Sequence, residues 1–164
     1  MSSRTLVLGR REGPVLHAVF SQTDGTLGGL VTTAGAMPPT IADIERGAYQ
    51  LSGEADELAE TVPSKYLDAI ANVLERAAMT IADIDLFVPH QTTQSLADKL
   101  GDALGLPRAK VYTDGVPRHA NIGAGGWMAG LVGARDAGRC PPGTTVLVAT
   151  VGGGMSWGAA IWTL

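Results

Sequence analysis

Residues 84–91 read IDLFVPHQ, an apolar run that ends in a proline and a histidine. The first five of these residues predict a buried strand, because β-branched and aromatic side chains dominate them. A helix is predicted next at residues 94–104, with Thr92 or Thr93 as its N-cap. A strand, a loop and a helix form the repeating unit of α/β proteins, whose functional sites often lie in such loops. His90 is therefore the first candidate for a functional side chain.

The rest of the chain alternates between strand-like and helix-like segments. Short strands are predicted at residues 5–8, 15–20, 110–112, 144–150 and 157–163. Helices are predicted at residues 41–46, 64–79 and 122–137. This alternation predicts an α/β fold, a mixed or mostly parallel sheet with helices packed on it, in one domain over residues 1–164. The glycines of the last helix lower its helix propensity and are expected to let another layer approach closely.

Composition excludes several classes of protein. The 164 residues are 45% hydrophobic and 17% charged, with a net charge of −4, and no run of Lys or Arg suggests a nucleic-acid partner. The apolar stretch 122–132 is too short and glycine-rich to span a bilayer. Residues 1–5 lack the apolar core of a signal peptide, so a cytoplasmic location is expected. The single cysteine permits no internal disulfide, which agrees with that location.

Three segments carry candidate chemistry, and each also has an ordinary structural interpretation. His90 stands before a helix N-terminus, where peptide dipoles favour a neutral imidazole that donates a hydrogen bond; alternatively it satisfies a loop carbonyl. Asn121 precedes a predicted helix, so it could serve only as an N-cap. Gly153 lies in a glycine run between two predicted strands. That run is either a tight turn or a source of a free backbone N–H for an oxyanion.

Together these segments resemble a known order of motifs. DLFVPHQ at 85–91, the helix start at Asn121, Pro142-Gly143 and GGGMSWGAA at 152–160 are similar to the C-terminal half of 3-oxoacyl-(acyl carrier protein) synthase III. The likeness is strong over residues 82–164 and weaker over 5–78. That family belongs to the thiolase-fold condensing enzymes, whose duplicated α/β unit forms a five-layered αβαβα sandwich. The resemblance implies that this chain supplies one of the two units.

The resemblance also implies roles for individual residues. His90 and Asn121 match the pair that hydrogen-bonds the thioester carbonyl of a malonyl substrate and stabilises the enolate left by decarboxylation. Gly153 matches the turn whose N–H helps form a second oxyanion hole over an acyl-cysteine. The residues expected to contact substrate are Gln91, Thr92, Thr93, Ala120 and Val151, and all of these except Gln91 depart from the family's usual residue. The substrates implied are thioesters of coenzyme A or acyl-carrier pantetheine, with no metal or redox cofactor.

The nucleophile of that chemistry is missing from this sequence. The one cysteine, Cys140, follows a predicted helix C-terminus, where the dipole raises rather than lowers a thiol pKa. We therefore expect a split enzyme in which a separately encoded N-terminal half brings the catalytic cysteine, in a heterodimer or higher hetero-oligomer. The shared interface is expected to exceed about 2,000 Å². Two alternatives stay open, a non-catalytic scaffold subunit and a fragment of a full-length synthase.

Two other candidate motifs are rejected, one on spacing and one on the segment that follows it. The three histidines, His17, His90 and His119, lack metal-ligand spacing, so no zinc site is predicted. Ser156 fits the letters of a hydrolase elbow, G-x-S-x-G, yet a strand-like segment follows it where the elbow needs a helix.

Overall fold

The computed structural model describes residues 15–53 and 55–164, and the strand predicted at residues 5–8 lies outside them. The main sheet is mixed and has four strands in the order β1-β6-β5-β4. Their bounds are Leu16–Thr23 for β1, Leu86–Pro89 for β4, Thr145–Gly152 for β5 and Ser156–Thr163 for β6. β4 and β5 are parallel, whereas β6 is antiparallel to both β5 and β1. The predicted mixed sheet with helices packed on it is confirmed.

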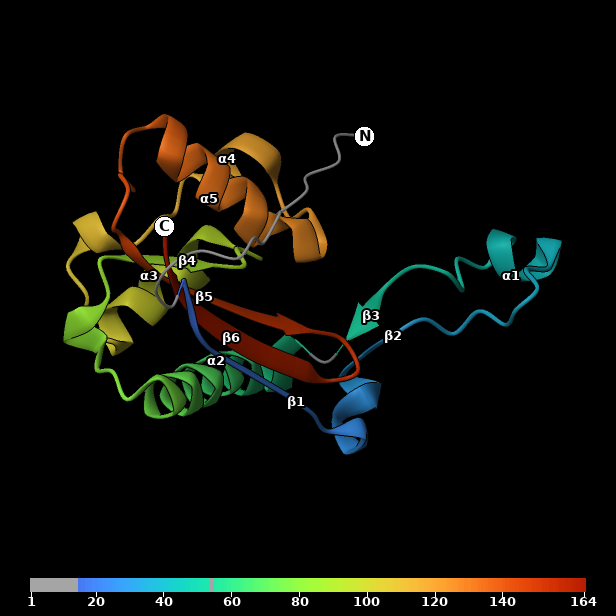
Figure 1. Cartoon of the computed structure of the whole chain (residues 1–164). Helices are drawn as coiled ribbons and strands as arrows, with labels where there is room; N and C mark the ends of the chain where they lie inside the picture. The colour runs from blue at the N-terminus through green and yellow to red at the C-terminus, as the bar shows by residue number, and fades with distance from the viewer. Residues whose placement is uncertain (1–14, 54) are drawn as a thin grey trace.

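Helices cover both faces of this sheet (Figure 1). The α-helices are α1 (Ile41–Glu45), α2 (Ala55–Ala77), α3 (Gln94–Ala103), α4 (Gly115–His119) and α5 (Gly126–Asp136). Short 3-10 turns are η1 (Gly25–Leu30), η2 (Ile81–Asp83), η3 (Arg108–Lys110) and η4 (Gly123–Gly125). α2 and α3 lie against one face, and α4 and α5 lie on the other (Figure 1). None of the helices within the described residues is long and apolar enough to cross a membrane.

A second, two-stranded sheet forms the base of an arm that extends away from the main sheet (Figure 1). β2 (Val31–Thr32) pairs antiparallel with β3 (Ser52–Gly53), and α1 lies between them in sequence at the far end of the arm. The side chain of Thr40 caps α1 by accepting a hydrogen bond from the Asp43 amide at 3.1 Å. The short helix predicted at residues 41–46 is thereby confirmed.

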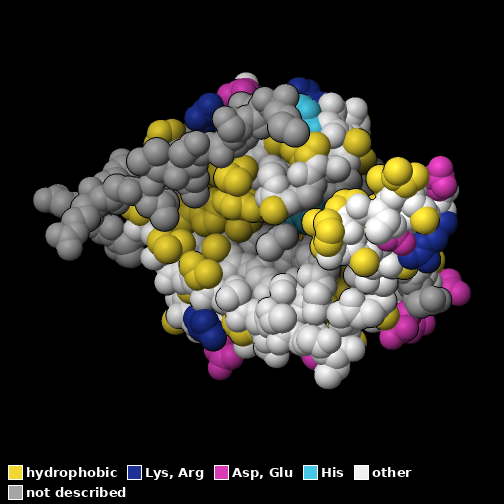
Figure 2. Space-filling model, turned by 90° about the vertical axis from the view of Figure 1, so that its right-hand side faces the viewer, with side chains coloured by type: hydrophobic (Ala, Val, Ile, Leu, Met, Phe, Trp, Pro, Cys, Tyr) yellow, Lys and Arg dark blue, Asp and Glu magenta, His cyan; other side chains and the backbone are white. Residues whose placement is uncertain are grey.

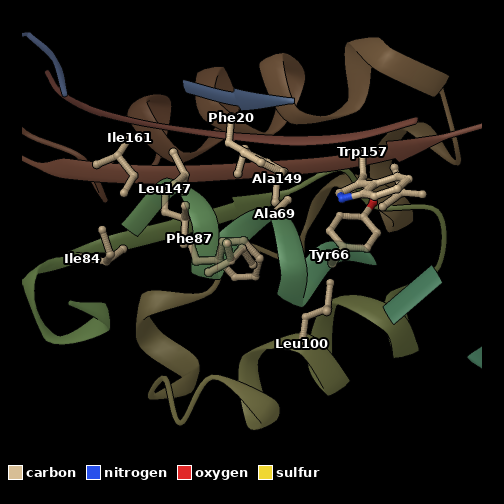
Figure 3. Packing of buried hydrophobic residues seen from close by; sticks show 14 of the residues in the cluster. Phe20, Tyr66, Ala69, Ile84, Phe87, Leu100, Leu147, Ala149, Trp157 and Ile161 are labelled. Atoms are coloured by element: carbon tan, nitrogen blue, oxygen red, sulfur yellow. The ribbon is translucent and has the colours of Figure 1, made fainter. Parts of the chain in front are cut away.

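Alternation along β4 and β5 divides the core into two clusters. Because successive side chains of a strand point to opposite faces, Phe87 and Leu147 pack with α2, whereas Leu86 and Val146 pack with α5. Figure 3 shows the larger cluster, with Tyr66 of α2 and residues of α3 facing the sheet. Burying each large apolar side chain contributes roughly 1.5–3 kcal/mol to the stability of the fold. Because β4 and β5 give side chains to both clusters, they hold both layers of helices.

The glycines of α5 allow the close approach that the sequence predicted. A Cβ on Gly130 would lie 2.9 Å from Cγ1 of Val88, and one on Gly133 would overlap the Tyr112 hydroxyl. Real Cβ atoms are not found that close to another heavy atom, so α5 could not pack against β4 with larger residues at these positions.

Three predicted elements differ from the structure. α2 begins at Ala55 rather than residue 64 and keeps Pro63 inside it, because Leu58 and Val62 of the added turns pack against the larger cluster. The strand predicted at 110–112 is wrong: Val111 makes one isolated parallel bridge with Phe87 after a 3-10 turn. The helix predicted at 122–137 begins only at Gly126, and α4 was not predicted.

The end of α2 contains a non-glycine residue in a left-handed conformation. Ala78 has φ +51°, and the backbone forms the paired C-terminal hydrogen bonds Met79 N–H to Leu74 C=O and Ala78 N–H to Glu75 C=O, both 3.0 Å. This is the helix-ending motif that ordinarily carries glycine at its left-handed position.

We predict that Ala78→Gly raises the free energy of unfolding by about 0.5–1 kcal/mol, because glycine adopts positive φ without strain from a Cβ. Ala71→Gly, at an exposed position within α2, is the matched control and should lower stability by about 1 kcal/mol. Urea unfolding of both variants checks the opposite signs. Destabilisation by Ala78→Gly would contradict the assigned backbone conformation.

Candidate active site

His90 follows the end of β4, and its backbone is held from two sides. Its N–H donates to the carbonyl of Ala149 in β5 at 2.8 Å. Its own carbonyl accepts a hydrogen bond of 2.8 Å from the hydroxyl of Tyr66 in α2. The residue is only 6% exposed, so its position is set by the strand pair and the helix beneath it.

The imidazole of His90 lies against Asn121. His90 Nε2 is 3.2 Å from Asn121 Oδ1, which also accepts the backbone N–H of Gly123 at 2.9 Å. Because that oxygen is an acceptor, Nε2 donates to it. Nδ1 of the same ring lies 3.5 Å from the Thr150 hydroxyl oxygen. The arrangement describes an imidazole that donates from Nε2. Because both of these bonds use Asn121 Oδ1, the hydrogens on its amide nitrogen remain available for another acceptor.

The loop that carries Asn121 has a constrained backbone. Ala120 adopts φ 54° and ψ −161°, a region that glycine ordinarily occupies. Gly126 lies beside the ring of His90, where a Cβ would come within 3.0 Å of its Cδ2 atom. Asn121 stands before η4 rather than directly before the long helix, so the helix start predicted at this residue is wrong. Its side chain nevertheless caps a backbone N–H, that of Gly123.

The glycine run lies at the neighbouring strand end. β5 ends at Gly152 and β6 begins at Ser156, so the turn joins two antiparallel strands. Gly153 is exposed within it, and Gly154 has φ +115°, a conformation that side chains rarely adopt. The turn and the His90 loop meet because the parallel strands β4 and β5 end at the same edge of the sheet.

A cavity of about 600 Å³ joins these elements. His90, Asn121 and Gly153 line it, together with Thr92, Thr93 and Val151. One wall is apolar and comes from the arm base, α2, α3 and the glycine turn: Val31, Leu51, Leu58, Val62, Leu96 and Met155. Lys99 and Ser95 of α3 add polar groups to the lining. Figure 2 shows this side of the molecule, with hydrophobic side chains gathered around a hollow.

Two of the predicted substrate contacts have other positions. Gln91 is 4% exposed, and its amide donates to the Tyr112 carbonyl at 2.8 Å and accepts the Gly115 N–H at 3.0 Å. Neither Gln91 nor Ala120 is among the described residues that line the cavity. Gln91 thus holds the loops behind the site, and Ala120 sets the backbone just before Asn121.

Sequence reasoning missed two residues of the site, Tyr66 and Thr150. Both contact His90, one at its carbonyl and one at its ring. Tyr66 belongs to the helix predicted at 64–79 and is next to Leu67 of that helix's apolar face. A polar hydroxyl at the edge of an apolar face was the only sequence signal for its role. Thr150 ends the strand predicted at 144–150, and nothing local distinguishes it from other strand threonines.

Cys140 lies far from these groups in the fold. It comes before the start of β5 at Thr145, whereas the His90 N–H bonds to Ala149, near the end of that strand. Its side chain is buried among Leu86, Tyr112 and Trp162, and burial raises the pKa of the thiol. The described residues also contain no group of three His, Cys, Asp or Glu side chains that could hold a metal ion.

The fold and site define the class of protein first. A mixed sheet with helices on both faces, and a His–Asn pair beside a glycine turn, is the arrangement of one half of a thiolase-like condensing enzyme. Comparison with known structures agrees. A 3-oxoacyl-(acyl carrier protein) synthase III from Thermus thermophilus matches with a TM-score of 0.80 at 28% identity, over 94% of this chain and 47% of that one. The priming β-ketosynthase of the R1128 polyketide pathway matches with a TM-score of 0.78 at 26% identity, over 95% and 47%.

Sequence comparison identifies the family. Residues 74–164 match the C-terminal domain of 3-oxoacyl-(acyl carrier protein) synthase III. The synthase III of Nitratidesulfovibrio vulgaris is 33% identical over 162 residues, which cover 96% of this chain and 48% of that protein. That of Granulibacter bethesdensis is 39% identical over 97 residues, 59% of this chain and 30% of that protein. The chain belongs to the 3-oxoacyl-(acyl carrier protein) synthase III family and spans about half the length of the curated relatives it matches.

The buried state of Cys140 leads to a reactivity prediction. Because burial raises its pKa, the thiolate is scarcer at neutral pH than in the unfolded chain. Alkylation by iodoacetamide at pH 7.5 should therefore be at least about 10-fold slower in the folded protein than in 8 M urea. Mass spectrometry measures the rate, and Cys140→Ser is the unlabelled control. Equal rates in the two states would show an accessible, reactive thiol.

Proposed function

We propose that this chain is the C-terminal subunit of a split synthase III-like acyltransferase and condensing enzyme of fatty-acid or polyketide-type biosynthesis. The observation that carries the proposal is the His90–Asn121 pair, which lines one cavity with Gly153 in a chain whose single cysteine is buried elsewhere. The catalytic thiol then comes from a separately encoded N-terminal half. The assembled enzyme is cytoplasmic and uses thioesters of coenzyme A or an acyl carrier protein, without a metal or redox cofactor.

The geometry supports stabilisation of a thioester enolate. A thioester oxygen that enters the cavity replaces Asn121 Oδ1 as the acceptor of the Nε2 hydrogen of His90 and also accepts an amide hydrogen of Asn121. The Gly123 N–H continues to hold Asn121 Oδ1. When a malonyl thioester loses carbon dioxide, the electrons of the broken C–C bond pass onto this oxygen. The two neutral donors stabilise that charge where it develops.

The enolate carbon then attacks the acyl group carried by the partner's cysteine. The carbonyl oxygen of that acyl group becomes an oxyanion, which the backbone N–H of Gly153 binds. The attack forms the new C–C bond, and collapse of the oxyanion re-forms the carbonyl, breaks the C–S bond and releases the cysteine thiolate. The apolar wall formed by Leu58, Val62, Leu96 and neighbouring residues suits the acyl chain.

Exposed apolar side chains support a partner chain. Large hydrophobic residues on the arm, at the cavity and on β1 are exposed, namely Leu16, Val19, Met37, Ile41, Ile44, Leu51 and Ile122. Exposed apolar patches of this kind are usual at protein interfaces. The curated relative is about twice as long as this chain, which matches 48% of it. A partner chain of similar size would provide the other half of the sandwich.

The decisive variants are His90→Ala and Asn121→Asp in the assembled complex. The second keeps Oδ1 for Gly123 and removes the donated hydrogens. Each should lower turnover about 100- to 1,000-fold, because one oxyanion donor is lost. His119→Ala, at an exposed residue of α4, is the matched control and should leave turnover unchanged. Full turnover with His90→Ala in an intact complex would favour the non-catalytic scaffold.

The partner itself can be captured. We expect co-expression with neighbouring open reading frames to yield a stable complex that contains a cysteine-bearing protein of similar size. The isolated chain should catalyse no condensation of malonyl-coenzyme A with an acyl-coenzyme A. Activity of a purified monomer would contradict the split arrangement. Intact mass spectrometry of the native protein tests the alternative of a fragment. A single longer polypeptide would show that the second half is covalently joined rather than a separate partner.

A further inference from the structure

The hydroxyl of Tyr66 lies between the ends of β4 and β5. Tyr66 is fully buried, with 0% of its surface exposed, and belongs to the larger core cluster with Trp157, at the same end of that core (Figure 3). Its hydroxyl donates to the His90 carbonyl at 2.8 Å, and the backbone N–H of Val151 approaches the same oxygen closely enough to oppose the burial that raises its pKa. One side chain from α2 thus joins the loop after β4 to the last residues of β5.

These two backbone groups would bond directly in a regular parallel ladder. Pro89 pairs with Ala149, and the His90 N–H donates to the Ala149 carbonyl. In a parallel pair the next bond runs from the Val151 N–H to the His90 carbonyl. The Tyr66 hydroxyl stands at this step, bonded to the His90 carbonyl and next to the Val151 N–H. A phenol oxygen thus stands where the two strands would otherwise bond to each other.

We propose that Tyr66 is a positioning residue that sets the distance between the two oxyanion-binding groups, the His90–Asn121 pair and the Gly153 turn. This inference rests on the function proposed above. His90 follows β4 and Gly153 follows β5, so the spacing of the strand ends is also the spacing of the two donors. A hydroxyl at this point fixes the spacing without occupying the cavity, whose described lining does not include Tyr66.

Neighbouring residues of α2 hold the other side of the turn. Asp68 accepts a hydrogen bond of 2.6 Å from the indole N–H of Trp157, the second residue of β6, and the Lys65 ammonium lies 4.3 Å from the centre of the same ring system. α2 therefore anchors both strands that flank the glycine turn. Burial raises the pKa of Tyr66, so the hydroxyl keeps its proton and its donor function over the working pH range.

The test compares Tyr66→Phe with Tyr112→Phe. Each variant removes one hydroxyl from a buried tyrosine, but Tyr112 packs in the smaller cluster on the other face of the sheet. In the assembled complex, with malonyl-coenzyme A and an acyl-coenzyme A as probes, Tyr66→Phe should lower kcat about 10-fold and leave KM within about 2-fold. Tyr112→Phe should change neither constant. A purely structural hydroxyl would shift the urea midpoint and leave kcat unchanged.

A second readout is independent of turnover. In ¹H–¹⁵N spectra of the assembled complex, Tyr66→Phe should shift the backbone amides of Val151 and Gly153 and the imidazole signals of His90. Tyr112→Phe should leave these signals in place. Unchanged signals at all three residues would overturn the inference, as would an unchanged kcat for Tyr66→Phe alongside a large loss for His90→Ala. If His90→Ala is silent, the proposed function fails, and Tyr66 as a positioning residue for that reaction falls with it.

Discussion

Parallel pairing of β4 with β5 is the constraint on which the rest of the structure depends. Parallel strands end at one edge of a sheet, so whatever follows β4 must lie beside whatever follows β5. Here these are His90 and the glycine turn. The pairing is stabilised by burial on both faces, because each strand gives alternate side chains to α2 on one side and α5 on the other. The site is thus an outcome of how the core packs.

Small residues allow Asn121 to lie beside His90. Asn121 comes from a loop that must pass close to the imidazole, and Gly126 provides the room beside the His90 ring. Further along α5, Gly130 and Gly133 let the helix rest on Val88 and Tyr112. These positions lower helix propensity but allow a short distance between helix and sheet. The two interpretations of Asn121, as a cap and as a site residue, are compatible, since one oxygen accepts both the Gly123 N–H and the His90 Nε2 hydrogen.

The cavity holds hydrogen-bond donors and an apolar wall, whereas the chain's only thiol is buried near the beginning of β5. Neutral donors stabilise a developing negative charge but cannot start acyl transfer, which needs a nucleophile. Apolar side chains of the arm and β1 are exposed, and the proposed partner chain would cover them. Both features support the same proposal of a shared active site.

Local patterns in the sequence determined most of the elements and the order of the site motifs. Apolar runs predicted β4, β5 and β6, and a cap at Thr92 or Thr93 predicted α3, whose Leu96 N–H bonds to the Thr93 hydroxyl at 3.2 Å. Local patterns failed where long-range packing outweighs propensity. Leu58 and Val62 extend α2 back past Pro63, and Val111 makes one bridge in place of a strand.

Tertiary structure alone decided which side chains meet. Tyr66 lies 24 residues before His90, Thr150 lies 60 after it, and Gln91 is drawn behind the site by the Tyr112 carbonyl. No short window of sequence contains these pairs, because they form only when α2 packs on the sheet and β4 pairs with β5. Sequence therefore named the His, the Asn and the glycine turn, and the packing of α2 and α5 on the paired strands decided their distances and their supports.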